Sequence, residues 1–301
     1  MMQQRRHDPM IAFLVGMLGI ALFSAMDAVM KGLVLAIGTF ATMLWRNLVG
    51  ALVTGTVCLA RRKGWPSRQV LKIHIARGAL CTLMGFLFFW GIGRIPLAQA
   101  IALAFIAPVI ALYLAAVLLK ERIARRTIAG SLVAFGGVLM IFVGQAQLEL
   151  GRDALLGSLA VLASAVCYAL NIILMRQQAL VADPVEISFF QAISVTVILG
   201  ALTPLVGAQF PDAIHWPTIL FAAALAVISS MLLSWAYARA EASYLATTEY
   251  TAFLWAALFG WLVFREPLQP LTLAGAAMIV AGCLIAARRP ADANPQLEAA
   301  A

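Results

Sequence analysis

Charged residues are scarce in this sequence. Asp, Glu, Lys and Arg make up 11% of the 301 residues, whereas 63% are hydrophobic, and the mean hydropathy is +0.97. Soluble domains are about a quarter charged and about half apolar. A water-soluble fold is therefore excluded, because its interior could not bury this much apolar surface. We expect the lipid bilayer to be a main partner of the chain.

Metal-binding and disulfide patterns are also lacking. The four cysteines lie in different apolar stretches without C-x-x-C spacing, and the three histidines lie far apart. Zinc sites and disulfide frameworks need recurrent close spacings, so we expect no metal and no cofactor. The sequence also lacks the glycine-rich P-loop that binds ATP phosphates, so we do not expect direct ATP drive.

Positive charge is in excess, but without the pattern of a nucleic-acid-binding surface. The net charge is +8 at pH 7 and the pI is about 9.8. The basic residues flank apolar stretches and do not alternate with aromatic residues, as a nucleic-acid patch would. Membrane proteins retain Lys and Arg in their cytoplasmic loops, so we expect no nucleic-acid partner.

Ten apolar stretches dominate the chain, each near the roughly 20 residues that a membrane helix needs. They are residues 10–33, 38–60, 72–93, 96–119, 126–144, 154–176, 185–207, 216–239, 243–264 and 270–287. The sequence therefore predicts an all-α integral membrane protein with ten transmembrane helices. The basic start resembles that of a signal peptide, but the apolar stretch after it is too long, so we expect an uncleaved first span.

The distribution of Lys and Arg predicts the orientation in the membrane. If the N-terminus lies in the cytoplasm, the basic loops "RRKGWPSR" (61–68) and "KERIARR" (120–126) lie there too. The opposite side then holds few basic residues, among them Arg94 and Arg265. Because Lys and Arg concentrate in cytoplasmic loops, we expect both termini in the cytoplasm. The expected location is the plasma membrane, which is the inner membrane in bacteria.

The two halves of the sequence repeat each other at a constant offset, which Trp90 and Trp235 define (235 − 90 = 145). Further matches at this offset are Arg94 with Arg239, Glu121 with Glu266, Gly130 with Gly275, and Gly137 with Gly282. Matches of such residue types at one offset indicate a duplication. We expect the repeats to cover residues 10–144 and 154–287, followed by a disordered cytoplasmic tail at 288–301.

The offset spans five predicted helices, which is an odd number. Two halves of five helices each therefore insert with opposite orientation. Such inverted repeats are typical of secondary transporters, in which the halves exchange conformations and open a central site to each side in turn. The sequence thus predicts two inverted five-helix repeats and transport by alternating access.

Two corresponding segments carry a resemblance to a known family. In "ALYLAAVLLKERIARRTIAGSLVAFGGVLMI" (111–141) and "AALFGWLVFREPLQPLTLAGAAMIVAGCLIA" (256–286), a long apolar helix ends in an acidic turn. With the five-plus-five repeat, the chain resembles the drug/metabolite transporter (DMT) superfamily, in particular its ten-helix EamA-type branch. The resemblance implies helices around a central cavity, with the fifth and tenth helices towards the periphery. It also implies transport of small metabolites, often export of amino acids, but no particular solute.

Asp27 and Lys31, in "FSAMDAVMKGL" (23–33), are the first candidate site residues. They are four residues apart and so share a helix face. Charged groups at membrane depth are functional candidates by default, so the pair could bind the charged ends of a zwitterion. Alternatively, Lys31 reaches the outer interface and Asp27 neutralises it. The repeat counterpart of Lys31 is a cation near the cytoplasm, which favours the interfacial interpretation of Lys31; Asp27 lies deeper.

Arg46 and Asn47, in "TMLWRNLVG" (42–50), and Glu249, in "ATTEYTAFLW" (246–255), lie further inside their predicted helices. Arginine stays charged and needs an anionic partner. Arg46 could clamp a substrate carboxylate, or form the structural pair with Asp27 or Glu249 that we favour. Glu249 could receive a substrate ammonium group or a coupling proton, or serve as a fixed partner for a basic residue.

Further candidates are polar residues within apolar stretches, where such groups line cavities or join helices. These substrate-binding candidates are Tyr168, Asn171, Gln191 and Tyr250. Pro108 should kink the fourth helix and is a candidate hinge. We interpret Glu121 and Glu266 as structural groups or groups at the edge of a gate.

The predicted function is secondary transport of a small polar or amphipathic metabolite, in the first place export of an amino acid. Lys31 and Arg46 would meet its carboxylate, and Glu249 or Asp27 its amine. Proton coupling and facilitated diffusion both stay open, as do a monomer and a homodimer. One alternative solute is a vitamin or nucleoside-like compound. An alternative of a different class is an integral-membrane enzyme that acts on lipid-linked substrates. The sequence lacks the convergent His, Asp or Glu residues that such an enzyme needs.

Overall fold

The computed structural model is a bundle of helices. It describes residues 9–61, 65–119, 125–147, 151–179, 181–207, 210–237, 239 and 248–287. The helices are α1 (Pro9–Ile37), α2 (Thr39–Ala60), α3 (Arg68–Ile92), α4 (Leu97–Ala104), α5 (Ala107–Leu119), α6 (Arg125–Gln147), α7 (Gly151–Ala179), α8 (Pro184–Val206), the 3₁₀ turn η1 (Ala213–His215), α9 (Trp216–Tyr237), α11 (Thr251–Phe264) and α12 (Pro270–Ala287). These ranges contain no strand, which confirms the all-α class. Glu121 and the predicted tail at 288–301 lie outside the described residues.

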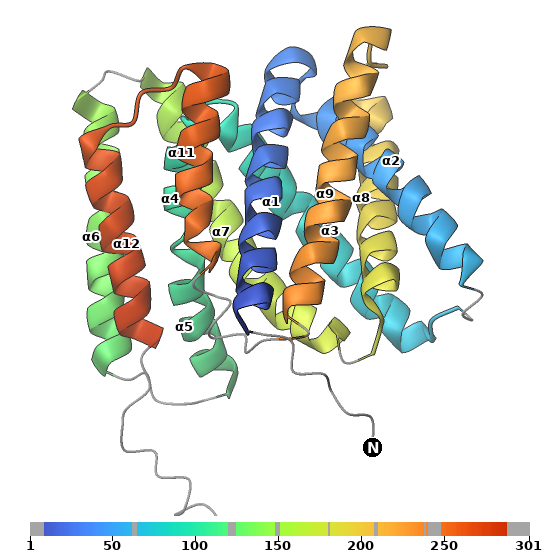
Figure 1. Cartoon of the computed structure of the whole chain (residues 1–301), viewed down its shortest axis with the longest axis horizontal. Coiled ribbons are helices and arrows are strands. Elements are labelled where there is room, and N and C mark those ends of the chain that lie inside the picture. Colours follow the sequence, from blue (N-terminus) through green and yellow to red (C-terminus); the bar gives the residue numbers. More distant parts are fainter. Residues whose placement is uncertain are drawn as a thin grey trace, which may run out of the picture.

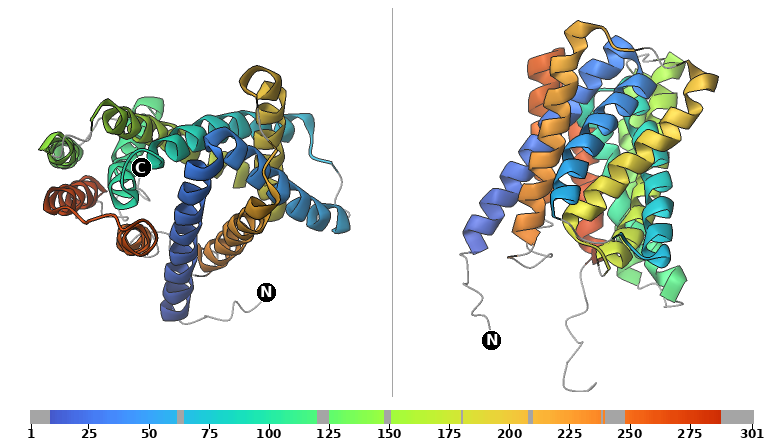
Figure 2. Two further views of the ribbon diagram at one scale, coloured as in Figure 1. Left: turned by 90° about the horizontal axis from the view of Figure 1, so that it is seen from above. Right: turned by 90° about the vertical axis from the view of Figure 1, so that its right-hand side faces the viewer.

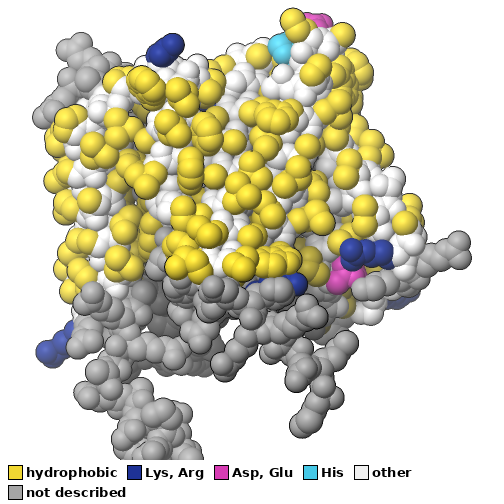
Figure 3. Space-filling view, in the orientation of Figure 1, with side chains coloured by type: hydrophobic (Ala, Val, Ile, Leu, Met, Phe, Trp, Pro, Cys, Tyr) yellow, Lys and Arg dark blue, Asp and Glu magenta, His cyan; other side chains and the backbone are white. Residues whose placement is uncertain are grey.

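The outer surface of the bundle is apolar. Among the described residues, six helical stretches, in α1, α2, α3, α7, α8 and η1–α9, are long and apolar enough to cross a membrane. Four shorter apolar stretches lie in α4–α5, α6, α11 and α12. The face in Figure 3 is covered by hydrophobic side chains, with Lys, Arg and acidic side chains near its two ends. This distribution is that of a bundle embedded in lipid.

Helices that are far apart in the sequence lie side by side. The pairs α1–α9, α2–α8, α3–α7, α4–α11 and α6–α12 pack against each other. Figures 1 and 2 show α6 and α12 together at one edge of the bundle, where the family resemblance implies them. We call the end where α1 begins and α12 ends the terminal end, and the opposite end the distal end (Figure 1). The interior is thus formed jointly by the two halves of the sequence.

Glycines allow α6 and α12 to touch through their backbones. A Cβ atom on Gly137 would lie 2.5 Å from the Gly275 carbonyl oxygen, and one on Gly282 would lie 2.4 Å from that of Gly130. Real Cβ atoms do not approach backbone so closely. The two helices therefore pack antiparallel. The two contacts are also related by the repeat: Gly137 corresponds to Gly282 and Gly275 to Gly130 at the offset of 145 (282 − 137 = 145).

Two arginines at this same offset make the same local contacts. Arg94 donates to the Trp90 carbonyl oxygen at 3.0 Å, and its guanidinium lies 3.5 Å from the centre of the Trp90 ring. Arg239 donates to the Trp235 carbonyl oxygen at 3.1 Å and lies 4.2 Å from that ring. The correspondence between the halves thus extends from residue type to side-chain conformation.

The fourth predicted helix, 96–119, is interrupted. It consists of α4, which ends at Ala104, and α5, which begins at Ala107 and carries Pro108 in its first turn. The proline ring clashes with the preceding helical turn and its nitrogen cannot donate a hydrogen bond. Pro108 therefore cannot donate to the Ala104 carbonyl oxygen, and the Val109 N–H donates to the Ile106 carbonyl oxygen at 3.1 Å. The Phe105 carbonyl oxygen, which Val109 would reach in a continuous α-helix, accepts a hydrogen bond from the Cys283 thiol at 3.1 Å. The kink expected at Pro108 is therefore a complete break of the helix.

A second break lies at the corresponding place in the other half. Tyr250, the counterpart of Phe105 (250 − 105 = 145), forms a turn directly before α11. The rings of Phe105 and Tyr250 contact each other edge to face, with centroids 5.5 Å apart. In Figure 1, α11 begins inside the bundle and does not reach the terminal end. The two breaks therefore meet within the bundle.

The glycine contacts lead to a first prediction. Replacing Gly137 by Ala should lower the free energy of unfolding by about 1–3 kcal/mol, because the backbones of α6 and α12 must move apart. Thermal unfolding in detergent micelles measures this change. Gly200→Ala in α8 is the matched control, since nothing lies within 4 Å of the added methyl group. Equal stability of the two variants would contradict the close contact.

Candidate functional site

Two opposite charges lie inside the bundle between α1 and α2. The Asp27 side chain in α1 is buried, with 4% exposed, and that of Arg46 in α2 is half-buried. Arg46 donates to the Met26 sulfur at 4.0 Å and to the Asn47 side-chain oxygen at 3.3 Å. Asn47 in turn donates to the Met43 carbonyl oxygen at 2.8 Å. The Met26 contact places the guanidinium next to α1, while Asn47 links it to α2.

The Asp27 and Arg46 side chains each keep one polar atom without a partner. Asp27 Oδ1 and Arg46 Nε are buried and make no hydrogen bond within the described residues. The two charges interact electrostatically, but no ion pair within 4.0 Å joins them in this part of the chain. Of the two structural partners suggested for Arg46 from the sequence, Asp27 is thus close enough to interact electrostatically but forms no ion pair within 4.0 Å in the described residues; pairing with Glu249 stays a prediction. Because a buried polar atom without a partner costs about 1–3 kcal/mol, a solute that supplies both a donor and an acceptor would be stabilised here.

Lys31 lies nearer the distal end and has a different partner. The residue is buried, and Nζ donates to the Ile95 carbonyl oxygen at 2.7 Å and forms an ion pair with Glu266. The second Glu266 oxygen accepts the Leu97 N–H at 2.8 Å. Lys31 is therefore neutralised by Glu266, and the interpretation in which Asp27 neutralises it is wrong. The Lys31–Glu266 pair joins α1 to the segment between α11 and α12.

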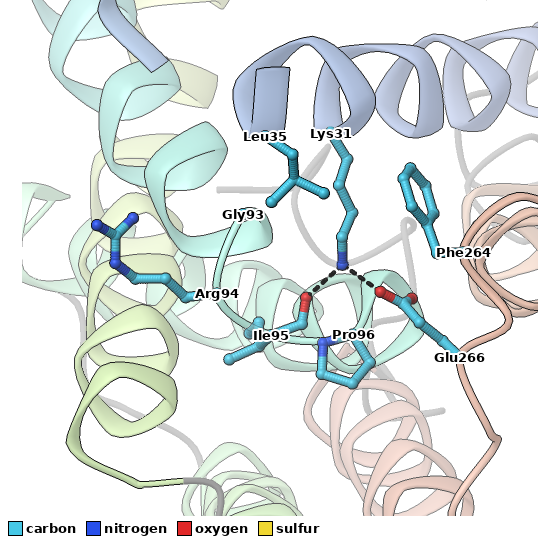
Figure 4. A pocket seen from close by; sticks show the side chains of 8 residues that line it. All are labelled: Lys31, Leu35, Gly93, Arg94, Ile95, Pro96, Phe264 and Glu266. Carbon is cyan, nitrogen blue, oxygen red and sulfur yellow. Dashed lines mark hydrogen bonds and ion pairs between the residues drawn. The ribbon is translucent and has the colours of Figure 1, made fainter. Parts of the chain in front are cut away.

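A pocket opens above this ion pair. It has a volume of about 330 Å³ and is lined by Lys31, Leu35, Gly93, Arg94, Ile95, Pro96, Phe264 and Glu266. Figure 4 shows Lys31 and Glu266 pointing towards each other, whereas the Arg94 guanidinium points away from them. We call it the distal pocket. Its walls come from both halves of the chain.

Glu249, Tyr168 and Tyr250 come together at the break before α11. Glu249 is half-buried and interacts electrostatically with the Tyr168 hydroxyl of α7 and with Tyr250. Tyr250 also contacts Phe105 at the break between α4 and α5. Glu249 thus lies within electrostatic range of two tyrosines, one of which packs at the meeting point of the two helix breaks. Gln191 is half-buried in α8, and no hydrogen bond within the described residues links it to the others.

A polar cluster between α3, α7 and α8 includes one predicted residue and several that sequence reasoning missed. Arg77 Nε donates to the Asn171 side-chain oxygen at 2.9 Å, and Arg77 also donates to Gln178. Gln178 and Glu186 contact the two ring nitrogens of His74, Glu186 at 3.0 Å. The spacings His74–Arg77 and Asn171–Gln178, of three and seven residues, place each pair on one helix face. Those spacings are the signal that could have revealed the cluster.

Hydrogen-bond direction shows which groups of the cluster donate and which accept. The guanidinium of Arg77 only donates, so the side-chain oxygen of Gln178 must face it. The Gln178 amide N–H then donates to His74 Nδ1, and a neutral His74 donates from Nε2 to Glu186. The imidazole is also stacked on Phe190, with centroids 4.4 Å apart. Each hydrogen bond in this series pairs a donor with an acceptor, and the series connects α3 to both α7 and α8.

Breaking the central link should destabilise the protein. Gln178→Leu leaves Arg77 and His74 without a shared partner, and should lower the free energy of unfolding by roughly 3 kcal/mol. Arg77→Met should lower the free energy of unfolding less in the Gln178→Leu background than in the native chain, because the two residues are coupled. Thermal unfolding in detergent gives both values. Gln177→Leu, at the exposed neighbouring position, is the control; strict additivity of the first two substitutions would rule out the coupling.

Comparison with known proteins places the chain among transporters. The model of the EamA-like transporter family matches residues 10–143 and again residues 155–288. A solved structure that is 20% identical has a TM-score of 0.62 and covers 93% of this chain and 98% of its own, which shows a shared fold.

Three relatives carry names of transporters. The pseudopaline exporter of Pseudomonas aeruginosa (strain UCBPP-PA14) is 29% identical over 271 residues, 88% of this chain and 92% of the relative. A probable terminal-alkyne amino-acid exporter of Streptantibioticus cattleyicolor is 31% identical over 224 residues, 70% of this chain and 72% of the relative. A riboflavin transporter of Rhizobium johnstonii is 26% identical over 215 residues, 71% of this chain and 70% of the relative. The chain therefore belongs to the EamA-like transporter family of the DMT superfamily and is a multi-pass membrane transporter.

Proposed function

We propose that this transporter exports a small zwitterionic metabolite of the amino-acid kind. The observation that carries the proposal is the pair of buried atoms without partners, Asp27 Oδ1 and Arg46 Nε. An ammonium group would donate to Asp27, and a carboxylate would accept from Arg46. Both buried charges would then be compensated by one solute, which is favourable because each is costly when left alone.

The relatives support export and the amino-acid class, since two are named as exporters and one of these as an amino-acid exporter. Lys31, expected from the sequence to meet the carboxylate, is engaged by Glu266. Arg46 is therefore the cation that we assign to this role. Glu249 is the group that we assign to an optional coupling proton, because it is an acid at the meeting point of the two helix breaks.

A second candidate solute is a vitamin with an aromatic ring system. The edge-to-face pair of Phe105 and Tyr250, close to Tyr168 and Glu249, offers rings against which such a solute could stack. One relative is named as a riboflavin transporter. Riboflavin therefore belongs in the same transport screen as the amino acids.

We propose alternating access through two inverted five-helix repeats. The counterparts at the offset of 145 are α1 with α7, α2 with α8, α3 with α9, and α6 with α12. If each helix is replaced by its counterpart, the contact between α1 and α9 corresponds to that between α7 and α3. In the same way, the contact between α3 and α8 corresponds to that between α9 and α2. All four contacts occur. In Figure 1, α6 and α12 run in opposite directions. We further propose that the terminal end faces the cytoplasm, as the Lys and Arg distribution predicts.

The central test is flux through the purified protein in liposomes. We expect saturable uptake of one or more amino acids, reduced at least about tenfold in Asp27→Asn and Arg46→Gln, since each removes one charge of the site. Asp212→Asn and Arg152→Gln, at exposed positions, should transport normally. Loss in Arg46→Gln should be larger for a substrate with a carboxylate than for a neutral analogue. Equal loss for both would indicate a structural role, and no flux of any solute would overturn the proposal.

Pro108 tests whether the paired helix breaks act as hinges. Pro108→Ala permits a continuous helix from α4 into α5, because it restores an N–H donor and removes the ring. We expect the transport rate in liposomes to change several-fold while the yield and thermal stability of the protein stay near those of the native chain. Unchanged transport kinetics would exclude a hinge at this position.

A further inference from the structure

The distal pocket contains a pair of opposite charges on its floor, and this pair is separate from Asp27 and Arg46. Lys31 comes from α1, in the first half, and Glu266 follows α11, in the second half. The side chain of Lys31 is 5% exposed and that of Glu266 is 18% exposed. The acid is therefore the member that a solute in the pocket reaches first.

Both members can take a further partner while they stay paired. Lysine has three N–H donors, and within the described residues those of Lys31 have two partners, the Ile95 carbonyl oxygen and Glu266. The two Glu266 oxygens accept from Lys31 and from the Leu97 N–H, and each carboxylate oxygen can accept a second hydrogen bond. A solute can therefore bind to both charges before they separate.

The surroundings of the pair limit what can separate it. The Phe264 ring lies 5.3 Å from Lys31 Nζ, and Leu35, Ile95 and Pro96 provide further apolar walls. In such surroundings, a charge that loses its partner is strongly destabilised. A simple anion would compensate Lys31 and leave Glu266 without a counter-charge, whereas a simple cation would leave Lys31 without one. A zwitterion compensates both.

We infer that the distal pocket binds a zwitterion with an apolar side chain, whose carboxylate takes Lys31 and whose ammonium takes Glu266. Bound in this way, the solute replaces the one ion pair on the pocket floor that joins α1 to the segment between α11 and α12. The pocket is then an outer site at which the solute itself releases the contact that closes the distal end. Its volume of about 330 Å³ lies in the usual range of small-molecule pockets, roughly 300–1,000 Å³. This inference rests on the proposed transport of a zwitterion.

The test uses a reporter in the pocket and three matched probes. Leu35, which lines the pocket and is 58% exposed, is replaced by Cys in the full-length protein in nanodiscs. The rate of its alkylation by a maleimide is followed by mass spectrometry. The probes are L-leucine, L-leucinamide, which lacks the carboxylate, and 4-methylpentanoate, which lacks the amine. Ile214→Cys, at an exposed position of η1 away from the pocket, reports any unspecific effect on alkylation.

We expect L-leucine to protect the cysteine at Leu35, and the two singly charged probes to require concentrations at least about tenfold higher. Glu266→Gln in the Leu35→Cys background should weaken protection by L-leucine by at least about tenfold. Arg265→Gln, which removes a neighbouring exposed charge outside the pocket, should not. Equal protection by the three probes, or none by L-leucine, would overturn the inference. The comparison of the probes is made with Lys31 and Glu266 unchanged, so it does not depend on how a variant of the ion pair folds.

Flux in liposomes separates this inference from the proposed function. The Asp27→Asn variant should lose transport but keep protection of the cysteine at Leu35, because Asp27 does not line the distal pocket. Transport of L-leucine with no protection at Leu35 would reject the outer site alone. Protection without any flux would leave the pocket as a binding site and reject the proposed transport.

Discussion

Inside a helix bundle surrounded by lipid, a charge is not hydrated, so its partners must come from the chain or from a solute. The described residues meet this constraint in three ways. Lys31 forms an ion pair with Glu266 and a hydrogen bond to backbone. Arg77 is neutralised less directly, through amide side chains that lead to His74 and Glu186. Asp27 and Arg46 differ from both, since each keeps a buried atom without a partner. This pair is therefore the place at which the proposed solute would compensate buried charge.

The two satisfied clusters each connect the halves of the chain. Lys31–Glu266 joins α1 to the start of the α11–α12 connection, and the His74–Arg77 cluster joins α3 to α7 and α8. A transporter that alternates must loosen contacts between its halves at one end while it keeps those at the other. Each cluster is costly to break without replacement, because a buried charge would be left alone. A solute that takes over the interactions of one cluster lowers the free energy needed to separate the helices at that end only. The two ends therefore need not open together.

The sequence predicts the helical stretches and the depth of the charges, because these depend on composition along one segment. It also predicts the packing of Gly130, Gly137, Gly275 and Gly282, since a spacing of seven places them on one face. It does not predict which charges meet. Helices that are apolar all round do not show which face is internal, so the register between distant segments is set by packing. For this reason the sequence suggests Asp27 as the partner of Lys31, whereas its partner is Glu266, 235 residues away, and the contacts of His74 and Gln178 are not apparent from it.

For the proposed export of a zwitterion, the charge of the solute also decides how the membrane potential acts. Each elementary charge that crosses the membrane is worth about 2.3 kcal/mol per 100 mV. A zwitterion carries no net charge, so its passage across the membrane neither gains nor loses energy from the potential. If Glu249 carried a proton inwards for each solute exported, one positive charge would enter per cycle, and a potential that is negative inside would favour export. Proton-coupled exchange and facilitated diffusion of the same zwitterion therefore differ in their response to voltage, although they use the same binding site.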